Sequence, residues 1–240
     1  MTKGDRYLRN TINMILTEGC MDENPRPHYS DGTPAHTKFI NHVIQQYDVQ
    51  KESPIVTLRP TAWKNAVKEI LWIYQMQSNK ISDLHDLGIK YWDEWDIGDG
   101  TIGCRYGATV KRHKLMDKLL EGLKNDPFGR RHIMSLWQED DFSDVTGGTT
   151  KGLNPCCYET IWNVRRVNKE LYLDMLLNQR SSDYIVSCSI NELQYIALLL
   201  MVAKHCNMKP GKFTHVIENC QIYDRHLNVT GKYFSIIFGN

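Results

Sequence analysis

The apolar positions of the chain recur with two different spacings, and these predict both helices and strands. Helices are predicted over residues 5–18, 61–76, 112–124 and 191–206. The clearest signal lies in 61–76, where Trp63, Val67, Ile70, Leu71 and Tyr74 share one face at a spacing of 3.6 residues. Strands are predicted within "RRHIMSLWQ", "ETIWNVRRV", "ELYLDMLLNQRS" and "FTHVIENCQIYDRH".

These elements mix along the chain without an internal repeat, a low-complexity segment or a linker. They predict a single α/β (or α+β) domain in which helices flank a mixed β-sheet. Between the first two helices, "EGCMDENPRPHYSDGTPAHT" gathers Pro, Gly, Asp and Asn. We interpret this segment as a long ordered loop of the kind that often carries function.

Composition narrows the classes of function. The chain has 240 residues, of which 41% are hydrophobic and 24% charged, and its net charge is +1. That size allows one sizeable core, and the near-neutral charge argues against a DNA partner held by bulk electrostatics. With no apolar run of roughly 20 residues and no signal-peptide core, we expect a cytoplasmic protein without a membrane partner.

Seven cysteines occur without a CxxC pair, so we expect neither a disulfide framework nor a metal site. The segment "LNPCCYETIWNVR" places two of them together, Cys156 and Cys157. Cys156 follows Pro155 at the junction of a loop and a strand, and Arg180 ends the next strand. Pairing of the two strands would bring a guanidinium beside the thiol, as a nucleophile requires. Ordinary buried cysteines are the alternative.

Glu69 also stands out, because it falls in an apolar stripe of its helix. Ala62, Ala66, Ile73 and Met76 lie seven, three, four and seven positions from it. A carboxylate in such a place has a raised pKa, which suits proton transfer. A buried ion pair is the alternative.

Several short motifs, in order and spacing, resemble folate-dependent thymidylate synthase, in the branch of some Gram-positive bacteria and their phages. They are "SDGTPAHT", "AWKNAVKEILWIYQ", "WDEWDIGDGTIGCRYG", "RR" at 130 and 131, "PC" at 155 and 156, "QRSSD", Asn191 followed by Tyr195, and "IYDRH". The resemblance assigns residues 1–226 to a thymidylate synthase-like domain whose sheet forms a dimer interface. Residues 227–240 would be a divergent tail.

The resemblance implies a methyltransferase that converts dUMP to dTMP with 5,10-methylenetetrahydrofolate as co-substrate and without a metal. Cys156 would add to C6 of uracil, and Glu69, Tyr106 and Arg180 would complete the catalytic group. The implied substrate-binding residues are Arg26, Arg130, Arg131, Gln179, Arg180, Ser181, Asp183, Asn191, Gln221 and Tyr223. The implied folate-binding residues are Arg59, Trp92 and Asp183.

Two of these roles compete with simpler interpretations. Arg130 and Arg131 would reach the phosphate from a partner subunit, which implies an obligate homodimer, but they could equally be solvated loop charges. Asn191 would read uracil, because its amide can donate to O4 and accept from N3–H. A helix N-cap is the alternative for Asn191.

The match has departures, and they affect the expected activity. Ser187 and Ser189 stand where the family has glycine and proline, Gln221 replaces a histidine, and the loop before Cys156 is longer than usual. The family also continues beyond "YDRHL", so we expect a shortened chain that holds the cofactor weakly. A deoxyuridylate hydroxymethylase or a non-catalytic nucleotide-binding relic remains as an alternative.

Overall fold

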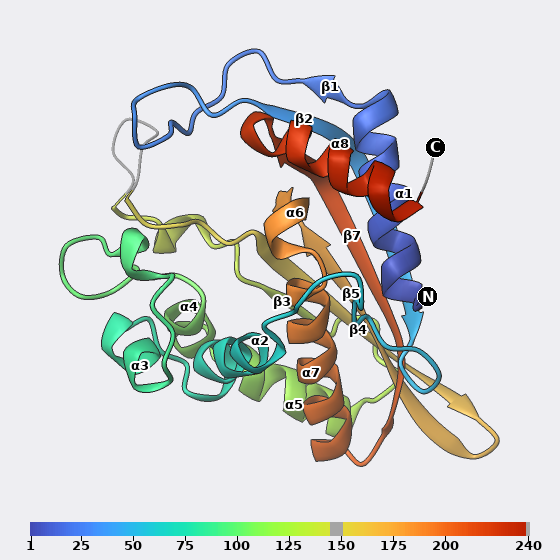
Figure 1. Ribbon diagram of the computed structural model, residues 1–240. Coiled ribbons are helices and arrows are strands. Elements are labelled where there is room, and N and C mark those ends of the chain that lie inside the picture. Colours follow the sequence, from blue (N-terminus) through green and yellow to red (C-terminus); the bar gives the residue numbers. More distant parts are fainter. Residues whose placement is uncertain (145–150, 239–240) are drawn as a thin grey trace.

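The structure, a computed structural model, describes residues 1–144 and 151–238 (Figure 1). Its centre is a seven-stranded sheet with the order β1-β2-β7-β5-β4-β3, and β6 pairs with β7. The strands are β1 (Cys20–Met21), β2 (Thr37–Asp48), β3 (Ile133–Ser135), β4 (Cys157–Val167), β5 (Glu170–Gln179), β6 (Ser182–Asp183) and β7 (Lys209–Tyr223).

The sheet is mixed, as predicted, because one central pair is parallel. β5 runs parallel to β7, whereas β2 pairs with β7 and β4 with β5 in antiparallel fashion. The tight β4–β5 hairpin turns through Asn168 and Lys169, both with positive φ, which is the backbone of a two-residue turn that matches strand twist. This hairpin fixes the register of β4 against β5 as far as Glu159, and a register shift between Glu159 and Cys157 then sets Cys157 opposite Gln179.

All four predicted strands exist, but one long strand was not predicted and three were assigned too many residues, among them β5, which ends at Gln179. β2 has twelve residues and was missed. Its apolar alternation is interrupted where His42 adopts a φ of 58° and the pairing with β7 skips a position. The strand in "RRHIMSLWQ" is limited to β3, and residues 224–226 begin a helix.

Eight α-helices accompany the sheet within the described residues. They are α1 (Lys3–Glu18), α2 (Trp63–Ile70), α3 (Ile81–Asp86), α4 (Gly107–Arg112), α5 (Leu115–Asn125), α6 (Tyr184–Ser187), α7 (Ile190–His205) and α8 (Asp224–Phe238). The four predicted helices correspond to α1, to α2 with its continuation, to α5 and to α7. α1 begins with a capping box in which Thr2 and Asp5 each accept a backbone N–H of the other.

The predicted helix at 61–76 contains a π-helical turn. α2 ends at Ile70, and Leu71–Gln75 continues it as a π-helix. The extra residue in this turn places Trp72, Ile73 and Tyr74 side by side in the core. Ala62 and Met76, the two ends of the stripe predicted around Glu69, are exposed, and so is Trp63 of the other predicted face. The predicted stripe is therefore correct around Glu69 and wrong at its two ends.

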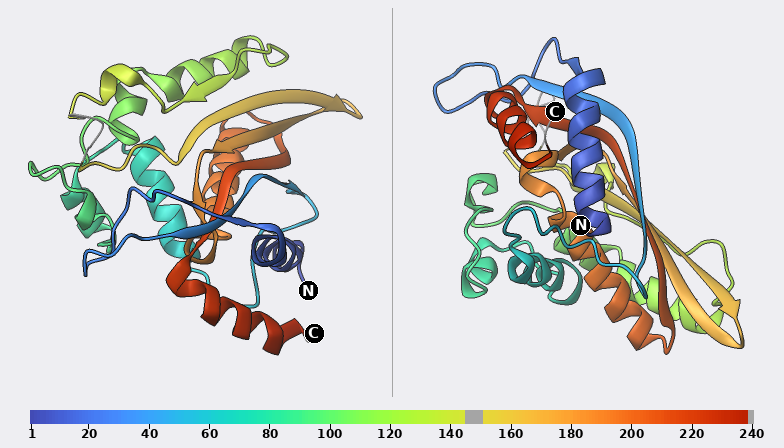
Figure 2. Two further views of the ribbon diagram at one scale, coloured as in Figure 1. Left: turned by 90° about the horizontal axis from the view of Figure 1, so that it is seen from above. Right: turned by 45° about the vertical axis from the view of Figure 1, so that its right-hand side comes forward.

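The helices cover one face of the sheet. α1 packs on β2 and β7, and α7 packs on β7 and β5. The right-hand panel of Figure 2 shows α1, α7 and α8 along one side of the long strands. The core on this side contains Trp162, Leu173, Met175, Leu177 and Phe213, all buried.

The opposite face of the sheet has no helix packed on it within the described residues. Thr214, Leu176, Ile161 and Ile133 lie in register across β7, β5, β4 and β3 on this face, and Ile44 of β2 pairs with Val216 beside them. Ile44 and Ile133 are 61% and 50% exposed. An apolar row of this length on an open sheet face is typical of a surface that a second chain covers.

No helix in residues 1–144 and 151–238 combines the length and the apolar character that a membrane span needs.

Candidate active site

A cavity of about 200 Å³ opens where the β4–β5 hairpin, α2, α6 and the start of α7 meet. The sequence elements explain its position: Cys156 precedes β4, Gln179 ends β5, and Asn191 lies in the first turn of α7. The residues predicted for the site that line this cavity are Glu69, Trp92, Tyr106, Cys156, Gln179, Ser181, Asp183 and Asn191. Sequence positions that are more than a hundred residues apart are thus brought to one place.

Arg180 lies beside the Cys156 thiol, as the predicted hairpin requires. Its Nη2 is 3.6 Å from Cys156 Sγ. The same guanidinium donates to the carbonyls of Pro155 and Asn154 at 2.9 Å, and the Arg180 N–H donates to the Cys156 carbonyl. These bonds fix the cation against the loop that carries the thiol. Its orientation is therefore set before any ligand binds.

Burial raises the pKa of the Cys156 thiol, and the Arg180 charge opposes that effect without cancelling it. Cys156 is nevertheless half-buried and faces the cavity, whereas Cys157 is 5% exposed and packs in the core. Burial raises the pKa of Cys157 well above its ordinary value. Cys157 also borders the cavity, but Cys156 is the less buried of the two and is the one with a cation beside its sulfur.

Tyr106 supports the backbone of the nucleophile candidate. Its hydroxyl accepts a hydrogen bond from the Cys156 N–H at 3.1 Å. Tyr106 precedes α4 with a φ of 48°, a conformation that bulky side chains rarely adopt. A strained backbone at this point indicates that the surroundings hold Tyr106 in place.

Glu69 is buried at the wall of the cavity. Desolvation raises the pKa of its carboxyl, and a hydrogen bond from the Tyr91 hydroxyl at 2.5 Å offsets part of the effect. Within the described residues Glu69 makes no ion pair, so the alternative of a buried ion pair does not apply to this structure. A carboxyl of this kind can give or accept a proton near neutral pH.

Asn191 faces the cavity and does not cap its helix. The residue at the cap of α7 is Ser189, and the Asn191 amide instead bonds to two other amides. Gln179 Nε2 donates to Asn191 Oδ1 at 3.3 Å, and Asn191 Nδ2 donates to Gln194 Oε1 at 2.9 Å. The N-cap alternative is wrong here. The amide remains available to a flat ring in the cavity.

A second and wider cavity of about 840 Å³ adjoins the first and shares Cys156, Ser181 and Asp183 with it. Four further residues predicted for substrate binding line it: Arg26, Arg180, Gln221 and Tyr223. Arg26 belongs to the predicted loop, which is fastened to α8 through Arg225. That guanidinium lies over the Tyr29 ring and donates to Asp31 and Thr33 at 2.6 and 2.8 Å. Two arginines and a tyrosine thus face one hollow beside the thiol.

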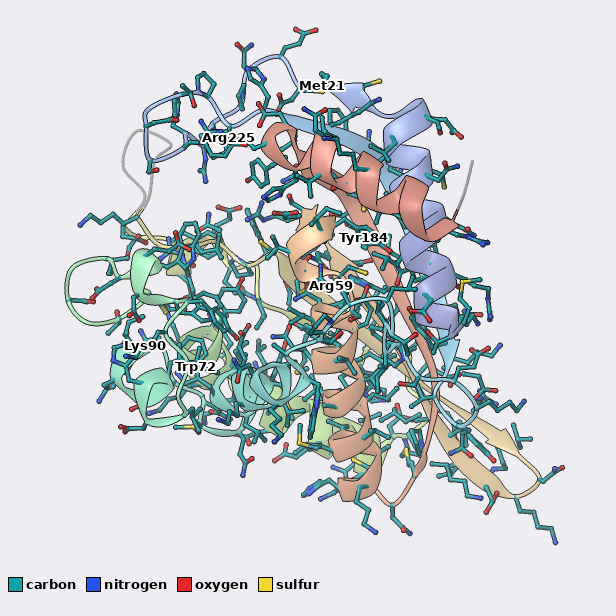
Figure 3. All side chains as sticks on the ribbon, viewed as in Figure 1. Met21, Arg59, Trp72, Lys90, Tyr184 and Arg225 are labelled. Carbon is teal, nitrogen blue, oxygen red and sulfur yellow. The ribbon has the colours of Figure 1, made fainter. Side chains whose placement is uncertain are left out.

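Three predicted residues lie apart from both cavities. Arg130 and Arg131 are exposed and border a different hollow with Phe128 and His132. Arg59 lies next to α6 (Figure 3), where its guanidinium donates to the carbonyls of Ile185 and Val186. In this chain Arg59 therefore holds α6 in place.

The two serines that depart from the family pattern are accommodated locally. Ser187 ends α6, and its hydroxyl bonds to Ser182 and to the Asp183 carbonyl. Ser189 has a φ of 64°, which a proline ring does not permit. The backbone before α7 is therefore one that a proline at 189 could not adopt.

Sequence reasoning missed several groups of the site. Tyr91 donates to Glu69, Asn154 accepts from Arg180 through its carbonyl, and Gln194 accepts from Asn191. Trp137 lies against the Arg180 guanidinium, 5.9 Å from ring centroid to Cζ. Among these, only Trp137 had a signal in the sequence, as an aromatic residue beside the predicted strand "RRHIMSLWQ".

Within residues 1–144 and 151–238 no group of His, Cys, Asp and Glu side chains is arranged to hold a metal ion. The seven cysteines are all unpaired.

Comparison with known proteins agrees with this geometry. The family model "Thymidylate synthase" matches residues 5–235 and thus extends into the segment predicted as a divergent tail. Thymidylate synthases of Streptococcus pneumoniae strain R6 and Streptococcus gordonii are each 48% identical over 227 residues, which is 93% of this chain and 80% of theirs. A solved structure, the thermostable thymidylate synthase A of Bacillus subtilis, superimposes with a TM-score of 0.83. It is 34% identical, and the match covers 97% of this chain and 84% of that one.

The resemblance inferred from the motifs is thereby confirmed, and so are the fold class and the folate-dependent methyltransferase activity that the family carries. The names of these relatives do not favour the hydroxymethylase. The separate character of residues 227–240 stays a prediction. This chain belongs to the thymidylate synthase family.

Proposed function

We propose that Cys156 is the nucleophile through which this chain methylates dUMP to dTMP. The observation that carries the proposal is the single cavity in which Cys156 Sγ, with Arg180 Nη2 at 3.6 Å, faces the Asn191 amide and the buried Glu69. C5 of uracil is a poor nucleophile until a thiolate adds to C6 and turns the ring into an enolate. A thiol, an amide and a carboxyl around one ring-sized hollow fit this chemistry.

Each side chain has a distinct task in the proposed reaction. Arg180 stabilises the thiolate of Cys156 as it forms, and Tyr106 holds the Cys156 backbone. Asn191 donates to O4 of the ring and accepts from N3–H, with Gln179 and Gln194 holding its amide. Glu69 takes up and returns protons at O4 and C5 through water.

The wider cavity would hold the rest of the nucleotide. Arg26, Arg180 and Ser181 bind the phosphate, for which guanidinium forks are well suited, and Tyr223 and Gln221 bind the ribose hydroxyl. Arg130 and Arg131 would complete the phosphate site from a partner subunit, since they lie outside the cavities of their own chain.

The residues around the wider cavity also fit 5,10-methylenetetrahydrofolate, which supplies both the one-carbon unit and the hydride. Trp95, Trp137 and Val186 offer flat apolar walls for a pterin ring, and Trp92 lies in the adjoining cavity. Asp183 uses Oδ1 to accept from two amides of α6, so Oδ2 remains to accept from a ring N–H. Arg59 contributes by holding the α6 carbonyls beside this aspartate.

Labelling with 5-fluoro-dUMP tests the nucleophile. This analogue, incubated with methylenetetrahydrofolate, should form a covalent adduct on Cys156 that mass spectrometry of the tryptic peptides locates. Cys156→Ser should abolish the adduct, and Cys157→Ser, the matched neighbour, should leave it intact. An adduct that persists in Cys156→Ser contradicts the assignment.

The product of turnover separates the remaining alternatives. A methylase yields dTMP and dihydrofolate in equal amounts from dUMP and methylenetetrahydrofolate. Hydroxymethyl-dUMP without dihydrofolate would indicate a hydroxymethylase, and tight dUMP binding with no adduct and no product would indicate a non-catalytic protein.

We also propose that the chain works as an obligate homodimer with shared sites, in the cytoplasm, where its seven unpaired cysteines stay reduced. The helix-free sheet face with Ile44 and Ile133 exposed supports a symmetric interface. Mixing Cys156→Ser protein with Arg130→Ala/Arg131→Ala protein tests the shared site. After subunit exchange, half the dimers carry one intact site, so about a quarter of native activity should return. If the mixture stays inactive, the arginines do not act across the interface.

A further inference from the structure

Behind Asn191 and Gln179 lies a buried pair of polar side chains, His215 and Glu192, that no step proposed above uses. His215 of β7 bonds through Nε2 to Gln179 Oε1 at 2.8 Å and through Nδ1 to Glu192 Oε1 at 3.2 Å. Gln179 continues the chain to Asn191 Oδ1 at 3.3 Å. His215, Glu192 and Gln179 are 1%, 2% and 2% exposed. A buried titratable pair is thus connected to the cavity by one amide.

The direction of each hydrogen bond between these polar side chains follows from one contact, that of Gln179 with the Ser181 carbonyl. Gln179 Nε2 lies 2.9 Å from the Ser181 carbonyl, which can only accept. The amide NH2 group of Gln179 must therefore face Ser181 and Asn191, and Oε1 must face His215. Because Oε1 can only accept, His215 Nε2 must carry a proton.

With a proton on Nε2, the charge of His215 decides whether Nδ1 accepts or donates the hydrogen bond to Glu192. If His215 is neutral, Nδ1 is an acceptor, and Glu192 must be the protonated donor. If His215 is charged, Nδ1 donates to the Glu192 carboxylate. Either way one proton lies between Glu192 and His215. Glu192 Oε2 has no hydrogen-bond partner among the described residues, so within them the Glu192 carboxyl is hydrogen-bonded to His215 alone.

The directions of these hydrogen bonds determine which donor and acceptor Asn191 presents to the base in the cavity. With Gln179 donating to Asn191 Oδ1, the Asn191 NH2 group is directed to Gln194 and the cavity. This presents a donor for O4 and a spare lone pair for N3–H, the pattern of uracil. Cytosine needs the reverse pattern, and turning Asn191 over would set its NH2 group against that of Gln179. Gln179 cannot turn in response while His215 Nε2–H faces it.

We propose that the buried Glu192–His215 pair fixes the Gln179 and Asn191 amides in the orientation that accepts a uracil nucleotide and rejects a cytosine nucleotide. Glu192 and His215 are positioning residues, because neither lines the cavity. The inference rests on the proposed role of Asn191 in reading the base. It predicts that selectivity can be lost by changing residues that the ligand does not touch, because His215 is separated from it by Gln179 and Asn191.

The test compares dissociation constants for dUMP and dCMP, measured by equilibrium dialysis with the full-length dimer. Glu192→Ala leaves His215 Nδ1 without a partner, so the Nδ1–H tautomer becomes accessible, Gln179 Oε1 loses its donor, and only the Ser181 carbonyl still holds the Gln179 amide. His215→Phe removes the donor to Gln179. Each variant should lower the selectivity for dUMP by about tenfold or more, since one correctly paired base contact contributes discrimination of that size.

Two control variants separate positioning from general damage to the core. Glu192→Gln can still donate an amide N–H to Nδ1, so it should keep selectivity within about threefold of the native ratio. Gln45→Met removes a buried polar group that lies opposite His215 across β2 and β7 but donates to the Tyr184 hydroxyl, at 2.8 Å, and to no member of this network. It should lower the melting temperature and leave selectivity unchanged.

Unchanged selectivity in folded Glu192→Ala and His215→Phe would overturn the proposal, as would an equal loss in Gln45→Met. If native protein itself shows no preference for dUMP, the role of Asn191 fails and this inference fails with it. Should both variants fail to fold, ¹⁵N-histidine spectra of the native protein decide. A protected Nε2–H on His215 supports the proposal, and a bare Nε2 overturns it.

Discussion

Replacing Glu69 with glutamine should stabilise the protein and at the same time impair it. The carboxyl is buried, its hydrogen bond from Tyr91 is 2.5 Å long, and no cation within the described residues pairs with it. Burial raises its pKa above the ordinary value of 4.5. Between that value and the raised pKa the folded state binds more protons than the unfolded state, so the free energy of unfolding falls as pH rises.

The free-energy cost of ionising Glu69 depends on how many hydrogen-bond donors stabilise its carboxylate. Above the raised pKa a buried charge is held by few donors, and such a group costs about 1–3 kcal/mol. Glutamine keeps an oxygen for the Tyr91 hydroxyl and carries no charge. For a chain of this length about 3 °C in melting temperature corresponds to each kcal/mol, so Glu69→Gln should melt about 3–9 °C higher at pH 8. Near pH 4, where both states of Glu69 are protonated, the difference should vanish.

Activity should move the other way, because proton transfer through Glu69 is lost. We expect kcat to fall about 10²- to 10⁴-fold. Thermal melts at pH 4 and pH 8, at one fixed protein concentration, check the stability, and dTMP formation checks the activity. Glu121→Gln, on the exposed side of α5, is the control and should change neither. A pH 8 melting temperature equal to or below the native one would refute the reasoning.

Three further changes have definite expected outcomes. Arg180→Gln removes the cation 3.6 Å from Cys156 Sγ and so raises the pKa of the thiol further. Alkylation of Cys156 by iodoacetamide at pH 8 should slow by about tenfold, and an unchanged rate would mean that Arg180 does not act on the thiol. Tyr106→Phe leaves the Cys156 N–H without its acceptor and should destabilise the fold by about 1–3 kcal/mol in urea titrations, whereas an unaltered midpoint would show that another group replaces it. Asn191→Asp should shift binding toward dCMP, because a protonatable acceptor suits the N3 and N4 edge of cytosine, and retained preference for dUMP would exclude Asn191 as the base reader.

Local patterns in the sequence predicted those parts of the molecule that depend on near neighbours. The alternation of β4 and β5 predicted the hairpin that brings Arg180 near Cys156, but no pattern indicated the register shift between Cys157 and Glu159, which sets Arg180 opposite Cys156. The stripe around Glu69 was sufficient to predict a buried carboxyl, because i and i+4 positions share a helix face whatever the rest of the fold does.

The parts that were missed depend on long-range pairing or on irregular backbone. β2 was missed because the irregularity at His42 interrupts its alternation, and because Gln45, a polar residue, faces the core at 1% exposure. The partners of His215 come from α7 and β5, which meet it only through the parallel pairing of β5 with β7. Nothing near His215 in the sequence indicates a buried glutamate.

Because of the π-helical turn at Leu71–Gln75, residues before and after it do not lie on the helix faces that one continuous α-helix would give them. One inserted residue rotates everything downstream by about 100° relative to an unbroken α-helix. Glu69 and Ile73 still reach the cavity together, as positions i and i+4, but a single helical wheel drawn over 61–76 misplaces Met76, which lies beyond the turn. In protein engineering, this segment should therefore tolerate a substitution more readily than a change of length. Deleting one residue would turn the cavity-lining side chains of this segment in new directions without changing their identity.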